Sequence, residues 1–520
     1  MMVRILTALL LLYSSLAFAS EPKVIVAGEI LSGKQVDGSN VSAFLGIPFA
    51  AAPVGDLRWQ GPQKYQPKHD LRDAAEFAPA CMQKQRIVDW YRDLAELFGN
   101  PRDVVADLPV SEDCLYLNVW SPAIGSSEKL PVMVYIHGGS NRSGWSWEPN
   151  YHGHALAQQG VVVVSIAYRL GDFGFFAHPQ LDQGPVVANF GLWDQVAALQ
   201  WIKDHITAFG GDADRITLFG ESSGGGNIVA LMFAENTDDL FAQVILQSTA
   251  GFGLRNVHSL ADERQRGVRF AEALGDEGPL TVAQMRGIPA DELLQRADNI
   301  SRGYYHSPVL DGALLSESVS SKLSSGNFHA RSMIIGSNAE EWYAYIAEDA
   351  DAGSEQDLAE EFFPSHATAA LAAVAAEPDI RLRMDRLRTA ARMLCPGQYF
   401  AQKMSAAGAD TWMYSFSRTR EGRAGNLWRA YHGVELPYVF GTHDEWMETS
   451  ETDLQVTAAT MSYWLHFAKT GNPNGPTTAN WPDYSKPGFS VQEINKPVRT
   501  IDAPEPELCR LFRDELRISR

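Results

Sequence analysis

The stretch 216-ITLFGESSGGGN-227 decides the fold class of this chain. An apolar run of strand type leads into 220-GESSG, and a segment compatible with a helix follows. In a G-x-S-x-G of this kind, the glycines on either side of the serine let the backbone turn sharply and leave the hydroxyl exposed. The same turn directs the amide of Ser223 toward the place where an oxyanion would form. The pattern predicts a nucleophile, Ser222, and the alternative is a glycine-rich turn that carries a surface serine.

Buried strands and amphipathic helices alternate on either side of this turn. The strand segments are continuous apolar runs, which is typical of strands buried on both faces of a parallel sheet. Residues 192–206 carry apolar side chains at helical spacing, and further helices are expected between 347 and 395 and from 454 to 469. The alternation predicts an α/β architecture, and no break in composition divides it into two domains. The apolar runs are 131-PVMVYIHGG, 161-VVVVSIAY and 332-SMIIGSN.

A second glycine-containing loop, 137-HGGSN, follows one of these strands about 85 residues before Ser222. Such a loop can bring its backbone N–H groups close to a substrate and supply further donors to an oxyanion hole. Without the serine turn, an ordinary strand-ending glycine turn would be an equally good interpretation of this loop. Together the two motifs favour nucleophilic acyl chemistry.

Composition and charge exclude several classes of protein. The chain has 520 residues, of which 45% are hydrophobic and 20% are charged, so it is neither a collagen, a coiled coil nor a mainly disordered chain. The formal net charge of −20 would repel a phosphate backbone, and we therefore expect no nucleic-acid partner. Nothing in the sequence specifies an oligomeric state.

The first nineteen residues have the pattern of a secretory signal peptide. Arg4 precedes the apolar run 5–12, and 17-AFA fits the small-residue cleavage site, so cleavage is expected after Ala19 and the mature domain spans 20–520. The alternative is a membrane anchor, but the run is shorter than the roughly 20 residues that a span needs. We expect a secreted or periplasmic protein without stable membrane insertion. In that oxidising compartment, four cysteines fit two disulfides, with three connectivities open: Cys81, Cys114, Cys395 and Cys509.

Eight segments occur in one order along the chain: 44-FLGIPFAAAPVGDLRW, 111-SEDCLYLNVW, 135-YIHGG, 189-NFGLWDQ, 209-FGGDADRITLFGESSGG, 308-PVLDG, 336-GSNAEEW and 432-HGVELPYVFG. With these segments the chain resembles the type-B carboxylesterase/lipase family of the α/β-hydrolase fold, which includes cholinesterases and microbial p-nitrobenzyl esterases. The resemblance runs from about residue 22 to 515. It implies a large, mostly parallel sheet flanked by helices in a single domain. It also implies a small-molecule ester substrate and no cofactor.

The resemblance implies a catalytic triad of Ser222, Glu341 and His432. A serine needs a base to become a nucleophile, and the base needs a partner that fixes its tautomer. Glu340 is the alternative acid in the same segment. Without the resemblance, other histidines would compete for the role of base, namely His205, His306 and His329. The pair His152 and His154 has no third ligand at zinc spacing, so no metal site is predicted.

Further roles follow from the same resemblance. The oxyanion hole would consist of the N–H groups of Gly139, Ser140 and Ser223, and Ser248 would orient the acid. The implied disulfides are Cys81–Cys114 and Cys395–Cys509, with Arg58 and Glu112 as an ion pair beneath the first. The acyl pocket would include Tyr304 and His306, with Arg302 aligned nearby, although Tyr304 and Tyr305 could equally be core aromatics.

The chain departs from the family pattern at several positions. Ser140 replaces the usual Gly or Ala, which would narrow the oxyanion hole. Asn141 stands where an aromatic residue is common, and Ser223 replaces an alanine. Asn227 and Arg429 replace a small residue and a glycine. Cation capture of the cholinesterase kind is not expected, because Val104 occupies the tryptophan position and Trp90 lies elsewhere in the loop.

The sequence thus predicts a serine hydrolase that cleaves carboxylic esters through an acyl-enzyme. One alternative is a lipase that acts at an interface, for which the amphipathic segment 88-VDWYRDLAELF could serve as a lid. The other is a non-catalytic binding module of the kind known in this fold family. Intact triad positions speak against the module.

Overall fold

An eleven-stranded mixed sheet forms the centre of the computed structural model, which describes residues 21–518 except 69, 250–257, 327, 329–330, 486 and 487. Strands β9 to β15 pair in parallel, and antiparallel strands complete both edges. The expected α/β fold with a large, mostly parallel sheet is confirmed. In sheet order the strands are β16 (Arg499–Ile501), β15 (Val491–Ile494), β14 (Thr411–Phe416), β13 (Met333–Asn338), β12 (Gln243–Gln247), β11 (Gly211–Glu221), β9 (Leu130–Ile136), β10 (Val162–Ile166), β8 (Tyr116–Ser121), β4 (Ser42–Pro48) and β3 (Lys34–Gln35).

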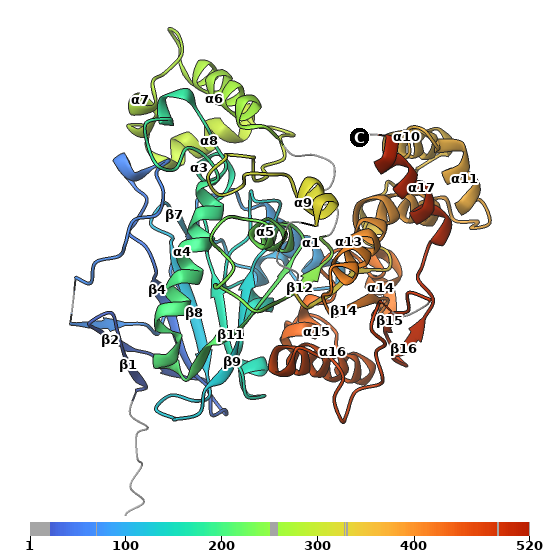
Figure 1. The fold of residues 1–520 in the computed structure, drawn as a ribbon, viewed down its shortest axis with the longest axis horizontal. Helices are drawn as coiled ribbons and strands as arrows, with labels where there is room; N and C mark the ends of the chain where they lie inside the picture. The colour runs from blue at the N-terminus through green and yellow to red at the C-terminus, as the bar shows by residue number, and fades with distance from the viewer. Residues whose placement is uncertain are drawn as a thin grey trace, which may run out of the picture.

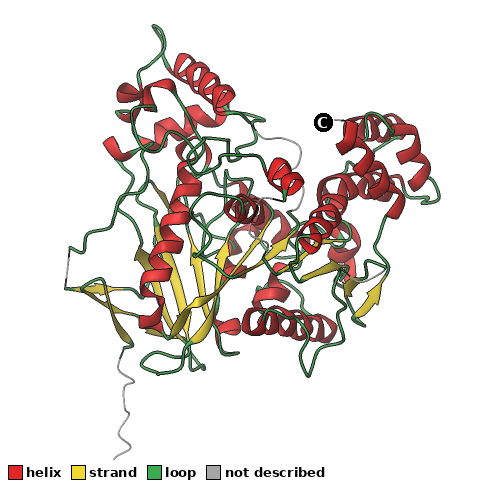
Figure 2. Cartoon of the chain, in the orientation of Figure 1, coloured by secondary structure: helices red, strands yellow, loops and turns green. Residues whose placement is uncertain are grey.

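Strand β9 explains why the central runs are apolar throughout. Val132, Val134 and Ile136 belong to one core cluster, whereas Met133 and Tyr135 belong to a second cluster. Successive side chains of a strand point to opposite faces, so both faces of the sheet are buried. Helices α4 (Phe190–His205) and α5 (Ser223–Met232) contribute to the first cluster, and α15 (Leu436–Phe440) and α16 (Glu451–Thr470) contribute to the second. Figure 2 shows these helices flanking the strands.

The predicted helices lie where the periodicity placed them. The segment 192–206 lies in α4 except for its last residue, and 454–469 lies in α16, which begins with a capping box between Ser450 and Asp453 and ends before Gly471. The remaining α-helices are α1 (Arg86–Leu97), α2 (His154–Ala157), α3 (Gly171–Gly174), α6 (Leu260–Leu274), α7 (Val282–Arg286), α8 (Ala290–Ile300), α9 (Val319–Ser325), α10 (Ala352–Phe362), α11 (Ala367–Val374), α12 (Ile380–Thr389), α13 (Cys395–Ala406), α14 (Gly422–Trp428) and α17 (Pro506–Ile518).

Smaller elements surround the sheet (Figure 1). Strands β1 (Lys23–Val26), β2 (Glu29–Ser32) and β5 (Leu71–Asp73) form a separate three-stranded sheet, and β6 (Ala80–Cys81) pairs with β7 (Val110–Ser111). Helices α6, α7 and α8 gather beyond one end of the main sheet, while α10, α11 and α17 form a group on the side of the C-terminal strands.

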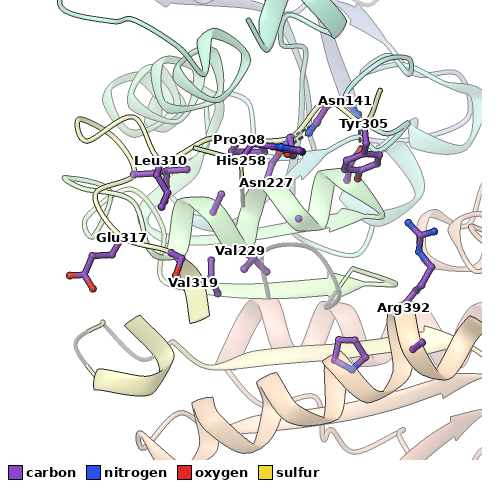
Figure 3. A pocket seen from close by; sticks show the side chains of 18 of the residues that line it. Asn141, Asn227, Val229, His258, Tyr305, Pro308, Leu310, Glu317, Val319 and Arg392 are labelled. Atoms are coloured by element: carbon purple, nitrogen blue, oxygen red, sulfur yellow. Dashed lines mark hydrogen bonds between the residues drawn. The ribbon is translucent and has the colours of Figure 1, made fainter. Parts of the chain in front are cut away.

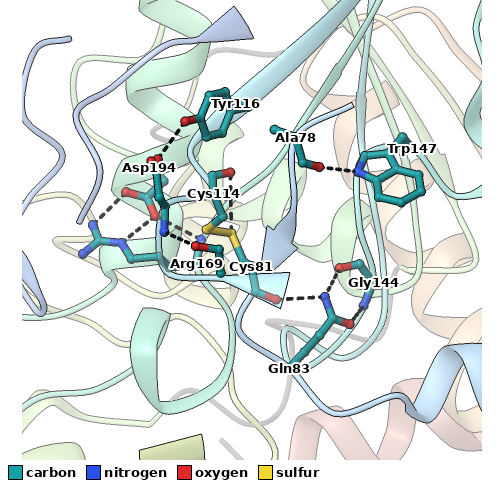
Figure 4. The surroundings of a disulfide bond; sticks show 11 residues. Ala78, Cys81, Gln83, Cys114, Tyr116, Gly144, Trp147, Arg169 and Asp194 are labelled. Atoms are coloured by element: carbon teal, nitrogen blue, oxygen red, sulfur yellow. Dashed lines mark hydrogen bonds and ion pairs between the residues drawn. A yellow bond between two sulfur atoms is a disulfide. The ribbon is translucent and has the colours of Figure 1, made fainter. Parts of the chain in front are cut away.

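Two disulfides join distant segments, and their pairing is the one that the resemblance implied. Cys81 bonds Cys114, and Cys395 bonds Cys509, which ties α13 to α17. Figure 4 shows the first disulfide. Near it, Arg58 forms an ion pair with Glu112 through two contacts, at 2.6 and 2.7 Å. Within the described residues, no helix is both long and apolar enough to cross a membrane. The expected signal peptide, residues 1–19, lies outside the described residues.

Candidate active site

Ser222 occupies the sharp turn between β11 and α5, which is called the elbow below. Its φ of 55° is unusual for a residue with a side chain, and the surroundings hold it there. The Ser222 N–H donates to the carbonyl of Gln247 at 2.9 Å, and the Thr249 hydroxyl donates to the Ser222 carbonyl at 2.7 Å. A Cβ atom at Gly224 would clash with the carbonyl oxygens of Ile136 and His137, so the turn requires glycine there. The turn therefore fixes where the Ser222 hydroxyl points.

Three side chains from distant parts of the chain form one hydrogen-bonded row. His432 Nε2 lies 2.8 Å from Ser222 Oγ, and His432 Nδ1 lies 2.6 Å from Glu341 Oε2. Glu341 follows the end of β13 and is fully buried. Its second oxygen accepts from the Ser248 hydroxyl at 2.6 Å and from the Asn338 N–H at 2.7 Å. The row places an imidazole against the serine hydroxyl and an anchored carboxylate against the imidazole.

The rival residues lie elsewhere. Glu340 accepts from the Ala430 N–H at 3.2 Å and pairs with Arg429 at 3.3 Å, on the outer side of the same loop. Arg429 has a φ of 56°, a conformation that the glycine common in the family adopts without cost. His306 faces Asp172 at 3.3 Å, and His205 packs on the ring of Trp201. His329 lies outside the described residues, and His152 stacks on the ring of Phe77.

A second buried carboxylate, that of Glu221, lies against the histidine. Its Oε1 atom is 3.1 Å from His432 Nε2 and has no hydrogen-bond partner among the described residues. Burial raises the pKa of Glu221. Burial alone would lower the pKa of His432, but the Glu221 and Glu341 carboxylates outweigh it, so the pKa of His432 is raised. The sequence reasoning overlooked Glu221, although its place directly before the serine was a sufficient signal.

The loop 137–141, in which oxyanion donors are expected and which is called the oxyanion loop below, has an unusual backbone conformation. Gly139, Ser140 and Asn141 have φ values of 102°, 60° and 53°. A Cβ atom at Gly139 would clash with the carbonyl of Ser143, so this position requires glycine. The Ser140 side chain is exposed, and the Asn141 N–H donates to the Ser223 hydroxyl at 3.1 Å. The hydroxyl that replaces the usual alanine methyl thus anchors the loop next to the elbow.

Asn141 and Asn227 form a reciprocal pair of buried amides. Asn227 Nδ2 donates to Asn141 Oδ1 at 2.8 Å, and Asn141 Nδ2 donates to Asn227 Oδ1 at 3.3 Å. Asn141 Nδ2 also donates to the His306 carbonyl at 3.1 Å. The pair connects the oxyanion loop to α5. Asn141 and Asn227, which both depart from the family pattern, thus satisfy each other's buried amide groups.

A cavity of about 520 Å³ opens beside the elbow (Figure 3). Its wall includes Ser223 and Asn141, but neither of the expected pocket residues Tyr304 and His306. The Tyr304 hydroxyl donates to Glu263 at 2.6 Å instead, and the intervening Tyr305 lines the cavity. The other lining residues are Gly226, Asn227, Val229, Ala230, His258, Ser307, Pro308, Leu310, Leu315, Glu317, Ser318, Val319, Glu361, Phe362, Ala391, Arg392, Pro396 and Phe512.

On the side of the candidate site where His432 lies, the surrounding side chains are aromatic. The Trp342 ring stacks on His432 with centroids 5.3 Å apart, and Trp90 packs against Trp428 and Tyr431. Val104 is exposed on the surface. Trp90 extends from α1, whose buried side chains pack inward. Helix α1 therefore does not offer a free apolar face.

Among the described residues, no group of three or more His, Cys, Asp or Glu side chains could hold a metal ion. The site is built instead from a hydroxyl, an imidazole and a carboxylate in one row.

Known proteins resemble the chain along almost its whole length. The model of the carboxylesterase family matches residues 20–512. The chain is 32% identical to the para-nitrobenzyl esterase of Bacillus subtilis (strain 168), over 90% of this chain and 94% of that protein. It is 32% identical to the fumonisin B1 esterase of Sphingopyxis macrogoltabida, over 91% and 86% of the two chains.

Solved structures agree with these relatives. A PNB esterase superposes with a TM-score of 0.80 at 30% identity, covering 95% of this chain and 99% of the other. A thermophilic PNB esterase also gives a TM-score of 0.80 at 30% identity, covering 95% and 100%. Sequence, fold and relatives thus agree over nearly the whole chain, and the chain belongs to the carboxylesterase family, the hydrolases of carboxylic esters.

Proposed function

We propose that this carboxylesterase cleaves its substrate through Ser222, His432 and Glu341 with an acyl-enzyme intermediate. The hydrogen-bonded row from Ser222 Oγ through His432 to Glu341 carries the proposal, at 2.8 and 2.6 Å. An imidazole in this position takes the serine proton as the oxygen attacks the ester carbonyl. The buried carboxylate of Glu341 holds the His432 ring in the tautomer that leaves Nε2 free to accept the serine proton.

The remaining steps follow from the same atoms. The carbonyl oxygen becomes an oxyanion beside the N–H groups of Gly139, Ser140 and Ser223, which stabilise its charge. The tetrahedral intermediate collapses, His432 gives its proton to the alkoxide, and the alcohol leaves with the acyl group on Ser222. Water then attacks the acyl-enzyme with His432 as base, which releases the acid and restores the serine.

Secretion is part of the proposal. The two disulfides support an oxidising compartment, and the pattern in residues 1–19 supports export. An interface-activated lipase is less well supported, because the amphipathic helix α1 packs its apolar side chains inward.

Hydrolysis of p-nitrophenyl butyrate by the purified protein tests the triad. Ser222→Ala should lower kcat about 10⁵-fold, and Glu341→Gln about 10⁴-fold, because serine, base and acid act as a unit. Glu340→Gln is the matched control. The Glu340 carboxylate pairs with Arg429, so this variant should retain activity. Turnover that survives in Ser222→Ala would refute the mechanism. A wild-type protein without esterase activity would favour the binding module.

A further inference from the structure

Arg392 places a positive charge in the wall of the cavity beside the elbow. The residue lies in a π-helical turn, Ala390–Leu394, between α12 and α13. Figure 3 shows its side chain directed toward the space that Tyr305 faces from the other side. π-Helical turns are rare and occur frequently at functional sites.

The Arg392 guanidinium has no carboxylate partner within 4 Å in the described part of the chain. It lies over the rings of Trp342 and Phe362, 5.5 and 5.9 Å from their centroids. By contrast, each of the buried arginines Arg58, Arg169 and Arg418 pairs with a carboxylate.

The position of the cavity indicates which part of an ester enters it. Its wall includes Ser223 and Asn141, next to the nucleophile and in the oxyanion loop, but not His432. Because His432 must protonate the departing alcohol, the alcohol lies on the histidine side and the acyl group lies on the other. Apolar residues of α5 and of the π-helical turn, such as Val229 and Ala391, line this part of the cavity and suit a chain of methylene groups.

From these observations we infer that the acyl group of the preferred substrate carries a second carboxylate, which Arg392 binds. The inference rests on the proposed ester hydrolysis. A planar guanidinium can bind a carboxylate with two parallel hydrogen bonds. The acidic residues of the wall, Glu317 and Glu361, are exposed, and in Figure 3 Glu317 lies at the end of the cavity away from Arg392. The substrate class is therefore a monoester of a dicarboxylic acid.

Matched esters test the inference directly. Mono-p-nitrophenyl esters of glutaric to suberic acid are compared with p-nitrophenyl esters of the monocarboxylic acids of equal chain length. We expect the wild type to prefer the diacid ester at one chain length. Arg392→Gln should lower kcat/KM for that ester about tenfold or more, mainly through KM, and change the neutral ester less than about twofold. Arg392→Lys should retain part of the preference.

Arg388→Gln provides the control. Arg388 precedes Arg392 by one helical turn and also lies over the Trp342 ring, at 4.5 Å, but it lines a separate surface cavity near Tyr345. Its replacement should leave the preference for the diacid ester intact. If the wild type shows no such preference at any chain length, or Arg392→Gln affects both esters equally, the inference is wrong.

Binding to an inactive protein separates this inference from the proposed function. Glutarate to suberate are titrated calorimetrically into Ser222→Ala and into Ser222→Ala/Arg392→Gln. We expect binding of one diacid to the first protein and a loss of affinity of about tenfold or more in the second. An active enzyme whose Ser222→Ala form binds none of the diacids would overturn the inference alone. A wild type that hydrolyses no ester would overturn the proposed function, and the inference with it.

Discussion

At the scale of single residues, the chain replaces common family residues in groups that contact one another. Asn141, Asn227 and Ser223 are each unusual alone, yet their polar atoms form one buried network beside the oxyanion loop. A buried amide without a partner would cost free energy, so one change requires the other. Ser140 and Asn141 also hold left-handed backbone conformations, which persist only when the surroundings enforce them. The network provides this enforcement.

Replacing Asn227 with alanine should therefore affect catalysis as well as stability. The change leaves the Asn141 side chain without its amide partner, which should lower the free energy of unfolding by about 1–3 kcal/mol. The freed loop should hold its N–H donors less well, and kcat should fall about tenfold with little change in KM. Kinetics on p-nitrophenyl butyrate and urea unfolding measure the two effects. A loss of stability with unchanged kcat would mean that the network only supports the fold.

At the scale of elements, the first disulfide loop supports the active site from outside. Cys81 and Cys114 close the loop that carries α1, and Gln83 within it exchanges two hydrogen bonds with Gly144, at 2.7 and 2.8 Å (Figure 4). Gly144 ends the segment that contains the oxyanion donors. The second disulfide joins α13 to α17, whose residues Pro396 and Phe512 line the cavity, and it closes a loop other than the one that holds Gly144. The two disulfides should therefore have different functional consequences.

Removing each disulfide by paired Cys→Ser replacements tests this difference. The loop-entropy model gives losses of about 4 kcal/mol for the separation of 33 residues and about 5 kcal/mol for 114. We expect the Cys81/Cys114 variant to lose most of its esterase activity at a temperature at which it is still folded. The Cys395/Cys509 variant should be the less stable of the two but keep its kcat on p-nitrophenyl butyrate. Equal effects on kcat would contradict the assigned role of the first loop.

The sequence predicted elements well where one local pattern determines them. The runs that became β9, β10 and β13 are buried on both faces and could be recognised without knowledge of their neighbours. The wall of the cavity was harder to predict, because successive residues of an extended loop face opposite sides, so Tyr305 lines the cavity whereas Tyr304 contacts Glu263. The place of Arg392 could not be predicted, since it depends on how α12 and α13 pack beside α5.

At the scale of the whole molecule, several acids are buried in the fold of a strongly acidic chain. Burial raises the pKa of Asp385 to about 8 and that of Glu148 to about 7. Two histidines, the buried His137 and the half-buried His152, have the opposite shift, because burial lowers their pKa values to about 4. The two kinds of group make the stability depend on pH in different ranges.

The pH dependence of stability follows from the direction of these shifts. The folded protein keeps protons on the buried acids that the unfolded chain would release, so their contribution is complete below pH 4 and is lost as the pH rises through 7 to 8. The raised pKa of His432 likewise makes the stability fall with rising pH, in a higher pH range. The stability that His137 and His152 contribute is complete above pH 6.5 and is lost as the pH falls from 6.5 through 4. Between pH 7 and pH 9 these two histidines therefore leave the free energy of unfolding unchanged.

The melting temperature should therefore fall by about 2 °C or more between pH 7 and pH 9. Asp385→Asn should make this decline shallower, because Asp385 is fully buried and releases its proton in that range. Asp103→Asn, at an exposed position, is the matched control and should leave the slope unchanged. Differential scanning fluorimetry at a fixed heating rate and constant ionic strength measures all three proteins. A melting temperature that rises toward pH 9 would show that the buried carboxyl groups are already ionised at pH 7, and that partners other than protons hold them in the fold.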